Sequence, residues 1–291
     1  MFLKKRILSK KQIINLIRKR REAIKKRKKA IKKNNLEIKK ITEYKNLCKW
    51  NYLKPHYNSK IPLHVYMTWQ TKTMPHLMQQ NYNNLVSGNP KLTFHLYDDN
   101  ECREFIKNNF PTDVLNAFDT LIPGAYKADL WRYCILYING GIYMDIKYQC
   151  VNGFKFITLT EKEHFVRDVI NSHVYNALIV TLPNNEIMRK CIYQIVENVK
   201  NKYYGNNSLN PTGPGLLGNY FSQPEKNTMD IYHNFTIIKN KLNEYYIVQN
   251  DRIILRYYNG YRDEQNKSQK TKHYGELWNK KNIYHTHGQD V

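Results

Sequence analysis

Residues 126–147 have the sequence YKADLWRYCILYINGGIYMDIK. In the first part of this stretch, apolar side chains recur at helical spacing, which predicts a helix over residues 125–138. Gly140 follows the last of these positions, as expected of a residue that ends a helix. Residues 141–147 then form a short β-prone run that ends in charge. The stretch therefore predicts a helix, a tight turn and a strand in direct succession. The apolar helix positions are Ala128, Trp131, Ile135 and Ile138.

Strands and helices alternate on both sides of this stretch. Asp98 is positioned to cap a helix that runs to about Asn109. Strands that alternate with helices predict an α/β fold, in which a mixed sheet is flanked by helices. The predicted strands are 61–69, 92–97, 176–181, 252–258 and 283–287, and further helices are predicted from Pro111 onwards and over about 184–200.

The N-terminal part of the chain has a different composition. Residues 1–45 contain 19 Lys and Arg against three Glu, a net charge of +16 out of +23 for the whole chain. This part contains no Pro or Gly and predicts a helix. Pro55 would stop a continuing helix. We therefore expect a basic helical arm over residues 1–50, a linker over 51–60 and a folded domain over 61–291.

The basic arm also carries an apolar stripe. Ile17, Ile24, Ile31 and Ile38 recur every seven residues, but the companion heptad positions hold Arg and Asn, so the pattern does not favour a coiled coil. Three interpretations stay open. The arm is a solvated helix without a specific partner, or residues 1–45 contact an anionic membrane surface or nucleic acid, or the Ile stripe supports self-association.

The sequence predicts neither a membrane span nor a disulfide framework. No segment approaches 18 apolar residues, so we expect no transmembrane segment. The apolar run at the N-terminus is too short for the core of a signal peptide. The five Cys are widely spread without a C-x-x-C pair, which favours reduced thiols over disulfides or a zinc site.

Two predicted strand ends carry side chains suited to a nucleotide sugar. Trp69 offers a flat face to a nucleobase, and Asp145 offers a carboxylate to a metal-bound diphosphate. Ligands of α/β sheets bind at such carboxyl ends. Asp129 and Arg132 stand three positions apart on the predicted helix, so their side chains reach the same side. The structural alternatives are core packing for Trp69, a solvated strand end for Asp145, and a surface ion pair for the helix residues.

Residues 128–147 resemble the signature block of glycosyltransferase family 32. This family of DXD-containing sugar transferases includes fungal initiating α-mannosyltransferases and bacterial capsular-polysaccharide enzymes. Its pattern, A-D-x-x-R-Y-x-x-L-Y-x-x-G-G-x-Y-x-D-x-D, is matched here except at the last position. Shorter similarities, among them 176–183 and 212–215, extend the resemblance over about residues 60–220.

The resemblance implies a GT-A-like, Rossmann-related fold and a retaining transfer of a sugar from a UDP- or GDP-sugar to a glycan, protein or lipid acceptor. It implies that Trp69 stacks on the base and that Asp129 and Arg132 contact the donor sugar and phosphate. Asp145 would face the diphosphate through Mn²⁺ or Mg²⁺, and Asn176 would lie on the sugar or acceptor side. The other donor-binding residues that it implies are Tyr126, Gly140, Gly141, Tyr143 and Gly213.

Lys147 stands where the family has its second acidic residue. A protonated Lys cannot bind a hard cation and repels one nearby. Three outcomes follow. Asp145 still holds a metal with help from His285 and His287, which share one face of a predicted strand; or Lys147 replaces the metal; or the domain binds without catalysis. The candidate catalytic residues are Asp129, Arg132, Asp145, Lys147 and Asn176, and the candidate metal ligands are Asp145, His285 and His287.

The favoured function is that of a hexosyltransferase. The alternatives are an inactive, glycosyltransferase-like binding protein and a protein that acts on anionic surfaces or nucleic acid through its basic arm. A hydrolase could use Asp129 and Asp145 as its carboxyl pair, but the neighbouring cations favour an anionic ligand. Without a predicted signal or anchor, we expect a cytoplasmic protein. The abundance of Lys, Asn, Ile and Tyr fits an AT-rich genome such as that of a large DNA virus, which would place it in the host cytoplasm or the virion.

Overall fold

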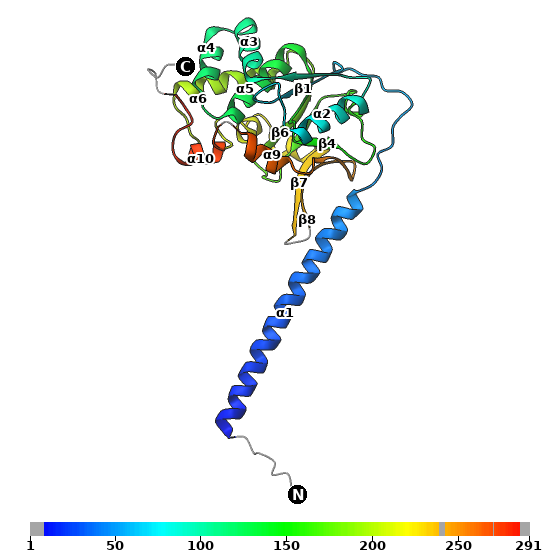
Figure 1. Ribbon diagram of the computed structural model, residues 1–291, viewed down its shortest axis with the longest axis vertical. Helices are drawn as coiled ribbons and strands as arrows, with labels where there is room; N and C mark the ends of the chain where they lie inside the picture. The colour runs from blue at the N-terminus through cyan, green and yellow to red at the C-terminus, as the bar shows by residue number, and fades with distance from the viewer. Residues whose placement is uncertain (1–8, 239–241, 270, 286–291) are drawn as a thin grey trace. The chain divides into compact units, whose positions relative to one another are not determined.

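The computed structural model describes residues 9–238, 242–269 and 271–285. The chain divides into two compact units, one made of Met1–Asn46 with Thr236–Asn243 and the other of Leu47–Phe235 with Glu244–Val291. The first unit contains nearly all of helix α1 (Lys10–Leu47), and the other labelled helices belong to the second (Figure 1). The arm and linker boundaries at residues 50 and 60 stay predictions.

Helix α1 confirms the predicted basic helical arm. It runs without interruption for 38 residues. Ile17, Ile24 and Ile31 are each about half exposed, at 47%, 47% and 52%. The helix therefore presents an apolar stripe on a strongly basic surface. Within the described ranges, no helix combines the length and the apolar character needed to cross a membrane.

The second unit is built on a mixed sheet of nine strands in the order β2-β1-β3-β6-β5-β7-β8-β9-β4. Strands β1, β2 and β3 are parallel neighbours, whereas β6 runs antiparallel to β3. This arrangement confirms the predicted α/β class with a mixed sheet. The strands are β1 His64–Thr68, β2 Thr93–Tyr97, β3 Gly141–Met144, β4 Tyr148–Cys150, β5 His164–Arg167, β6 Val174–Thr181, β7 Ile231–Ile238, β8 Leu242–Gln249 and β9 Arg252–Tyr257.

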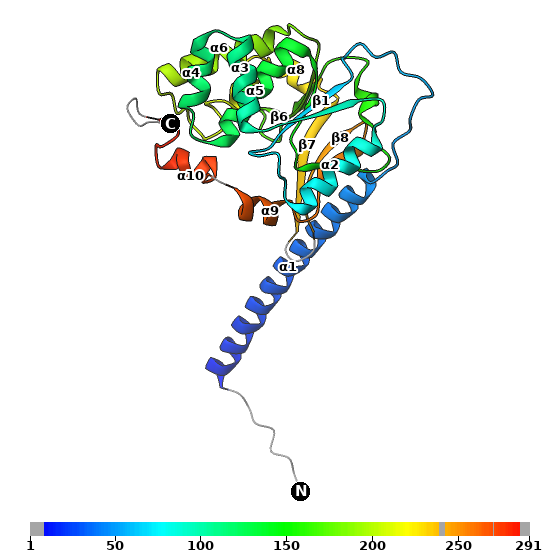
Figure 2. The same cartoon turned by 45° about the horizontal axis from the view of Figure 1, so that its top comes forward.

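Hydrophobic side chains cover both faces of this sheet. Along β3, Tyr143 points into a core shared with helices α3 to α6, while Ile142 and Met144 point into a second core on the other face. Helices α3 to α6 therefore gather on one side of β1 and β6 (Figure 2). The helices are α2 His76–Gly88, α3 Asp99–Asn109, α4 Thr112–Thr120, α5 Gly124–Asn139, α6 Glu186–Lys200, α7 Pro214–Gly218, α8 Gln223–Asn227, α9 Tyr261–Ser268 and α10 Tyr274–Asn279, with a 3₁₀ turn at Phe156–Leu159.

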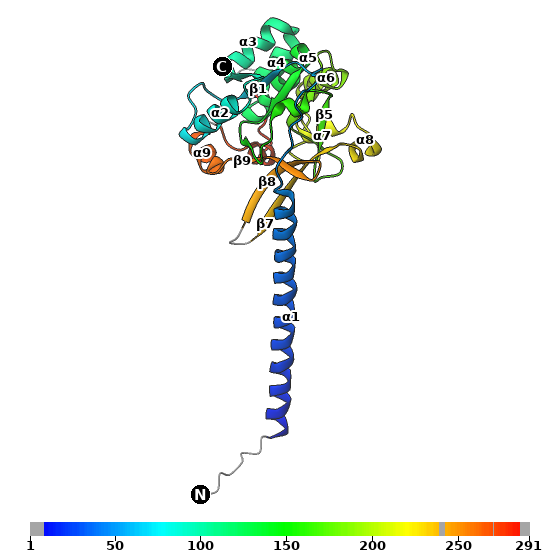
Figure 3. The same cartoon turned by 90° about the vertical axis from the view of Figure 1, so that its right-hand side faces the viewer.

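Helix α9 lies beside α2 on the side of the second core (Figure 3). The Glu264 carboxylate of α9 accepts hydrogen bonds from the backbone N–H groups of Leu77 and Met78, at 2.7 and 2.9 Å. These two N–H groups belong to the first turn of α2 and have no partner within that helix. The contact therefore replaces the side-chain cap that the preceding Pro75 cannot provide.

A two-glycine turn joins α5 directly to β3, as the sequence predicts. Gly140 has φ +60° and ψ −163°, and Gly141 has φ +102°. A Cβ atom on Gly140 would lie 2.6 Å from the Pro183 nitrogen, and one on Gly141 would lie 2.8 Å from the His64 carbonyl oxygen. Glycine is thus needed twice, for the backbone conformation and for the close approach of neighbouring strand ends. The turn lets β3 begin directly after α5.

The predicted strand over 283–287 is wrong as far as it can be compared, because only one antiparallel bridge forms there, between Tyr284 and Leu121. Residues 286 and 287 lie outside the described residues. The segment pairs with the short connection between α4 and α5. This connection is not a strand, so the pairing does not continue into a ladder of backbone hydrogen bonds. Together with helix α10, the segment holds a different part of the chain: Trp278 Nε1 of α10 donates to the Tyr204 carbonyl at 2.6 Å, and the buried Tyr284 donates its hydroxyl to the Tyr203 carbonyl.

Candidate functional site

Four elements bring polar side chains to one edge of the sheet. Asp145 directly follows β3, and Trp69 directly follows the parallel neighbour β1, so both leave the sheet at the same edge. Strand β6 runs the other way and brings Asn176 to this edge, where the Asp145 backbone N–H donates to the Ala177 carbonyl at 2.9 Å. Helix α5 supplies Asp129 from its buried middle. The geometry thus unites residues that are far apart in the sequence.

Asp129 is buried and fully engaged in hydrogen bonds. Its Oδ1 accepts from Asn176 Nδ2 at 2.9 Å, and its Oδ2 accepts from Thr212 Oγ1 at 2.7 Å. Arg132 Nη2 lies 3.1 Å from Oδ1. Burial raises the pKa of the Asp129 carboxyl above its ordinary value, and the attraction of Arg132 and the Thr212 hydrogen bond partly offset this rise. The contacts hold the carboxylate in one position.

Arg132 bridges the two carboxylates of the site. Its Nη1 donates to the Asn176 carbonyl at 2.7 Å and lies 3.4 Å from Asp145 Oδ1. The guanidinium also stacks over the Tyr143 ring, 4.3 Å from its centroid. Its side chain is only 6% exposed. The predicted alternative of a surface ion pair with Asp129 is therefore wrong, because the pair lies in the core beneath the sheet edge.

Asp145 is held between two cations and a phenol. Its Oδ2 lies 2.6 Å from Lys147 Nζ, and its Oδ1 accepts from the Tyr143 hydroxyl at 2.7 Å. Burial alone would raise the pKa of this carboxyl, but Lys147 and Arg132 attract its anion strongly enough to bring the pKa below its ordinary value. Asp145 is therefore anionic across the neutral pH range.

Lys147 is buried among tyrosines. Its Nζ lies 5.5, 5.4 and 5.4 Å from the ring centroids of Tyr148, Tyr175 and Tyr257. The Tyr148 and Tyr175 hydroxyls hydrogen-bond to each other at 2.8 Å, which fixes two of these rings. Burial by itself would lower the pKa of Lys147, but the adjacent Asp145 raises it well above the ordinary value. The ammonium group is therefore charged at neutral pH.

The exposed fractions order these residues from inside to outside. The side chains of Arg132 and Asp129 are 6% and 11% exposed, whereas those of Lys147 and Asp145 are 16% and 20% exposed. A ligand that approaches the sheet edge therefore meets Lys147 and Asp145 first, with Arg132 behind them. Two carboxylates and two cations give the cluster a formal charge of zero. Such a cluster can hold an anion without a large excess of negative charge to overcome.

Of the remaining predicted donor-binding residues, Tyr143, Gly213 and Tyr126 lie in or beside this cluster, whereas Gly140 and Gly141 lie at the opposite end of β3 from Asp145. Tyr143 contacts both Asp145 and Arg132, as described above. A Cβ atom on Gly213 would lie 3.2 Å from Asp129 Oδ2, so the loop passes directly over that carboxylate. Tyr126 donates its hydroxyl to the Ser208 carbonyl at 2.6 Å and so supports the same loop. Trp69 is partly buried, and its indole N–H is buried without a hydrogen-bond partner among the described residues.

The structure does not place the predicted ligand His285 in the cluster. His285 is exposed, its backbone N–H donates to the Thr120 carbonyl at 2.8 Å, and none of the contacts recorded for the described residues links it to Asp145. His287 lies outside the described residues. Across residues 9–238, 242–269 and 271–285, no three His, Cys, Asp or Glu side chains are grouped so as to hold a metal ion. The residues present therefore do not fit a divalent cation, which prefers several oxygen ligands.

Several members of the site were not predicted. Thr212 lies in a segment that carries the family resemblance, yet its hydrogen bond to Asp129 has no signal in the sequence. Tyr133 accepts from Asn176 Nδ2 at 3.1 Å, and its place after Arg132 in the family pattern could have indicated it. Tyr175 precedes Asn176 on β6, and the alternation of strand side chains could have placed it on the opposite face, towards Lys147.

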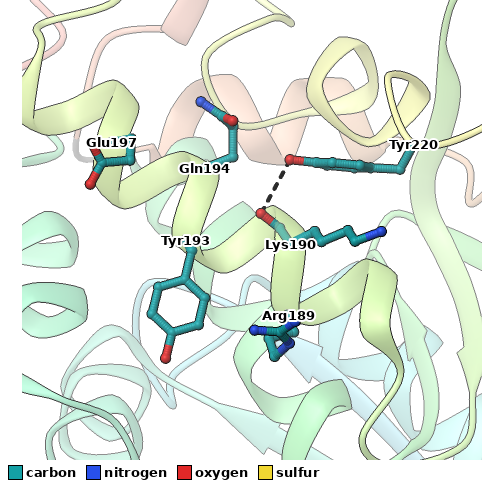
Figure 4. A pocket seen from close by; sticks show the side chains of 6 residues that line it. All are labelled: Arg189, Lys190, Tyr193, Gln194, Glu197 and Tyr220. Carbon is teal, nitrogen blue, oxygen red and sulfur yellow. Dashed lines mark hydrogen bonds between the residues drawn. The ribbon is translucent and has the colours of Figure 1, made fainter.

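A separate hollow lies on the outer side of α6 (Figure 4). It has a volume of about 350 Å³, and the Tyr220 hydroxyl donates to the Lys190 carbonyl across it at 3.2 Å. None of the predicted site residues lines it. Its lining residues are Arg189, Lys190, Tyr193, Gln194, Glu197 and Tyr220.

Comparison with known proteins supports the resemblance described for residues 128–147. Residues 75–166 match the family described as a glycosyltransferase sugar-binding region containing a DXD motif. The chain is 26% identical over 172 residues to an uncharacterized glycosyltransferase of Acanthamoeba polyphaga mimivirus, which covers 57% of this chain and 67% of that protein. It is 31% identical over 93 residues to inositol phosphoceramide mannosyltransferase 3 of Schizosaccharomyces pombe, covering 32% of this chain and 26% of the yeast protein.

The chain thus spans about two thirds of the mimivirus protein and about a quarter of the yeast enzyme. Among solved structures, the PaToxG glycosyltransferase superposes with a TM-score of 0.44 at 16% identity, over 65% of this chain and 78% of that one. The description of the matched family and the names of both sequence relatives refer to one kind of activity, which is glycosyl transfer.

Proposed function

We propose that this chain, which carries a glycosyltransferase sugar-binding region over residues 75–166, moves a sugar from a nucleotide-sugar donor to a carbohydrate-bearing or lipid acceptor. The buried cluster at the carboxyl ends of β1 and β3 carries this proposal. It places Lys147 and Arg132 on either side of Asp145 at the edge of the sheet where ligands of α/β folds bind.

The chemistry of the reaction matches this arrangement. Departure of a nucleoside diphosphate develops negative charge on a phosphate oxygen, and fixed positive groups near that oxygen lower the barrier. Lys147 is the outer cation and would face the diphosphate. Arg132 would orient Asp145 and Asp129 through its contacts with both. Asp129 and Asn176 are joined by a hydrogen bond, lie next to these cations and would contact the donor sugar.

The family resemblance adds finer parts to the proposal. It favours transfer with retention at the anomeric carbon and a nucleobase that stacks on Trp69. The name of the yeast relative, an inositol phosphoceramide mannosyltransferase, favours a mannose donor and a phosphoceramide lipid as the acceptor. The proposed location in the host cytoplasm or the virion accords with the relative from a mimivirus.

A donor screen tests the proposed function. The full-length protein is heated with a panel of UDP- and GDP-sugars, and release of the nucleoside diphosphate is followed in parallel. We expect one donor to raise the Tm, because a ligand at about 100 times its Kd stabilises the folded state by about 2.7 kcal/mol. The same donor should release its nucleoside diphosphate, and NMR of the product should show a retained anomeric configuration. A flat Tm and no release with every donor would contradict the proposal.

We further propose that α1 places the enzyme on an anionic membrane surface. The basic surface of α1 is complementary to anionic headgroups, and its half-exposed Ile stripe offers apolar side chains to the interface. Nucleic acid would use the charge but not the stripe, so the stripe favours the membrane. A lipid acceptor of the kind named for the yeast relative would lie on the same surface.

Vesicle binding tests the role of α1. We expect the full-length protein to sediment with phosphatidylcholine vesicles that contain phosphatidylserine at least about tenfold more strongly than with phosphatidylcholine alone. Serine at Ile17, Ile24, Ile31 and Ile38 should weaken this binding while the charge stays the same. Serine at Ile170 and Leu182, which are comparably exposed on the other unit, serves as the control. Unchanged binding of the fourfold variant would contradict insertion of the stripe.

A further inference from the structure

We propose that the donor diphosphate binds directly to the Lys147 ammonium group, without a divalent cation at Asp145. The inference rests on the proposed function and specifies how the same site meets the donor. Sugar transferases with a DXD motif commonly use a metal, so the proposal concerns a departure by this chain from its relatives. Three observations carry it: the occupation of the Asp145 oxygens, the charge of the cluster, and the way in which Lys147 is held.

Both oxygens of Asp145 already have strong partners. Lys147 Nζ lies 2.6 Å from Oδ2, and the Tyr143 hydroxyl donates to Oδ1 at 2.7 Å. A Mg²⁺ ion would need to lie about 2.1 Å from one of these oxygens, and each oxygen already has a partner within 2.7 Å. The two positive groups would compete for one carboxylate in a buried place, where their repulsion is poorly screened. Lys147 thus occupies the position that a cation would need.

The charge of the cluster leads to the same conclusion. A carboxylate in place of Lys147 would give three acids against Arg132, a formal charge of −2, which a divalent cation would neutralise. With Lys147 the sum is already zero, from Asp129 and Asp145 against Arg132 and Lys147. A divalent cation would raise the buried cluster to +2, which is costly. The cluster as it stands can receive the anionic diphosphate without a metal.

Lys147 is held in the position that this role requires. An ammonium group has three N–H donors, and Asp145 takes one of them. The rings of Tyr148, Tyr175 and Tyr257 surround the cation at 5.4 to 5.5 Å, and the Tyr148–Tyr175 hydrogen bond stiffens this enclosure. At 16% exposure the side chain still reaches the surface. Its other N–H donors have no hydrogen-bond partner among the described residues and are held in place before the ligand arrives, which favours tight phosphate binding.

The first experiment needs no variant. Binding of UDP, GDP and their sugars to the full-length protein is measured by calorimetry in EDTA and again in Mn²⁺. We expect the preferred nucleotide to bind in EDTA with a Kd within about threefold of its value in Mn²⁺, since a threefold change is a small fraction of the binding free energy. Calorimetry with Mn²⁺ alone should show no binding at this site. Nucleotide binding that needs Mn²⁺ would overturn the inference and leave the proposed function standing. Absence of nucleotide binding in both buffers would contradict both.

Variants of Lys147 give the second experiment. Lys147→Met should weaken nucleotide binding in EDTA by at least about tenfold, whereas Lys147→Arg should retain most of it. Lys147→Asp restores the acidic pair and should bind nucleotide only with Mn²⁺, with a matching change in the Mn²⁺ EPR signal. The control is Lys162→Met, which removes another Lys–Asp pair, with Nζ 3.0 Å from Asp230 but 64% exposed. Equal nucleotide binding by Lys147→Met and the control would overturn the inference, and if Lys147→Met does not fold, Lys147→Arg and the wild-type comparison decide.

Discussion

Replacing Arg132 by methionine is expected to lower the free energy of unfolding by about 3–5 kcal/mol, because it leaves two buried carboxylates without their shared cation. Arg132 Nη2 lies 3.1 Å from Asp129, and its Nη1 lies 3.4 Å from Asp145 and donates to the Asn176 carbonyl at 2.7 Å. Lys147 can compensate only Asp145. Urea denaturation measures the loss, and a fall in Tm of roughly 10 °C should accompany it.

The chain contains a matched control for this substitution. Arg189 also pairs with an acid three residues earlier on a helix, Glu186, at 2.8 Å, but the two side chains are 46% and 63% exposed. Arg189→Met should change the free energy of unfolding by no more than about 0.5 kcal/mol. If the two variants lose the same stability, the buried position of Arg132 does not matter, and the description of the cluster as a desolvated network is wrong.

The second large effect is expected for Gly140→Ala. A φ of +60° with ψ −163° is a conformation that almost only glycine adopts, and the new Cβ would lie 2.6 Å from the Pro183 backbone nitrogen. The Pro183 backbone cannot move aside as a flexible side chain can. The backbone strain at residue 140 and the steric overlap with Pro183 therefore add to each other. We expect a loss of at least about 3 kcal/mol in urea denaturation.

The other end of the same helix supplies the control. Gly124 opens α5, and its added Cβ would have Thr271 Oγ1 as its nearest neighbour, at 3.9 Å, which is ordinary contact. Gly124→Ala should leave stability unchanged or raise it by up to about 1 kcal/mol, because alanine favours the helix. A Gly140→Ala protein as stable as Gly124→Ala would show that the turn relaxes more easily than its contacts suggest.

The sequence was most informative where local signals agree. Asp98 caps α3 as predicted, and the Glu101 carboxylate in turn accepts a hydrogen bond from the Asp98 backbone N–H, so two reciprocal contacts define the start of that helix. The helix, glycine turn and strand over 124–144 also match the prediction, because apolar spacing and glycine chemistry both act over a few residues. In the site, the spacing of Asp129 and Arg132 correctly placed both on one side of α5.

Other features depend on contacts between distant parts of the chain. Helix α2 has Pro75 before it and is capped from α9 by Glu264, so its own sequence gives only a weak start signal. The short strand β4 forms by pairing with β9, as in Tyr148 with Tyr257, which no local pattern could indicate. The same pairing of β4 with β9 brings two of the tyrosine rings around Lys147 together, those of Tyr148 and Tyr257. The burial of the Asp129–Arg132 pair likewise became visible only in the folded chain.

The support of the loop over Asp129 has a consequence for the newly made protein. Thr212 and Gly213 lie on this loop, and its start at Tyr203 and Tyr204 is held by side chains from the last part of the described chain, Trp278 and Tyr284. During synthesis the chain leaves the ribosome with its N-terminus first and grows by about 5–20 residues per second. The nascent chain therefore exposes all the charged groups of the site well before Tyr284 emerges. A truncated chain that ends before α10 would contain these groups. It would lack the hydrogen bonds from Trp278 and Tyr284 that hold the start of the loop.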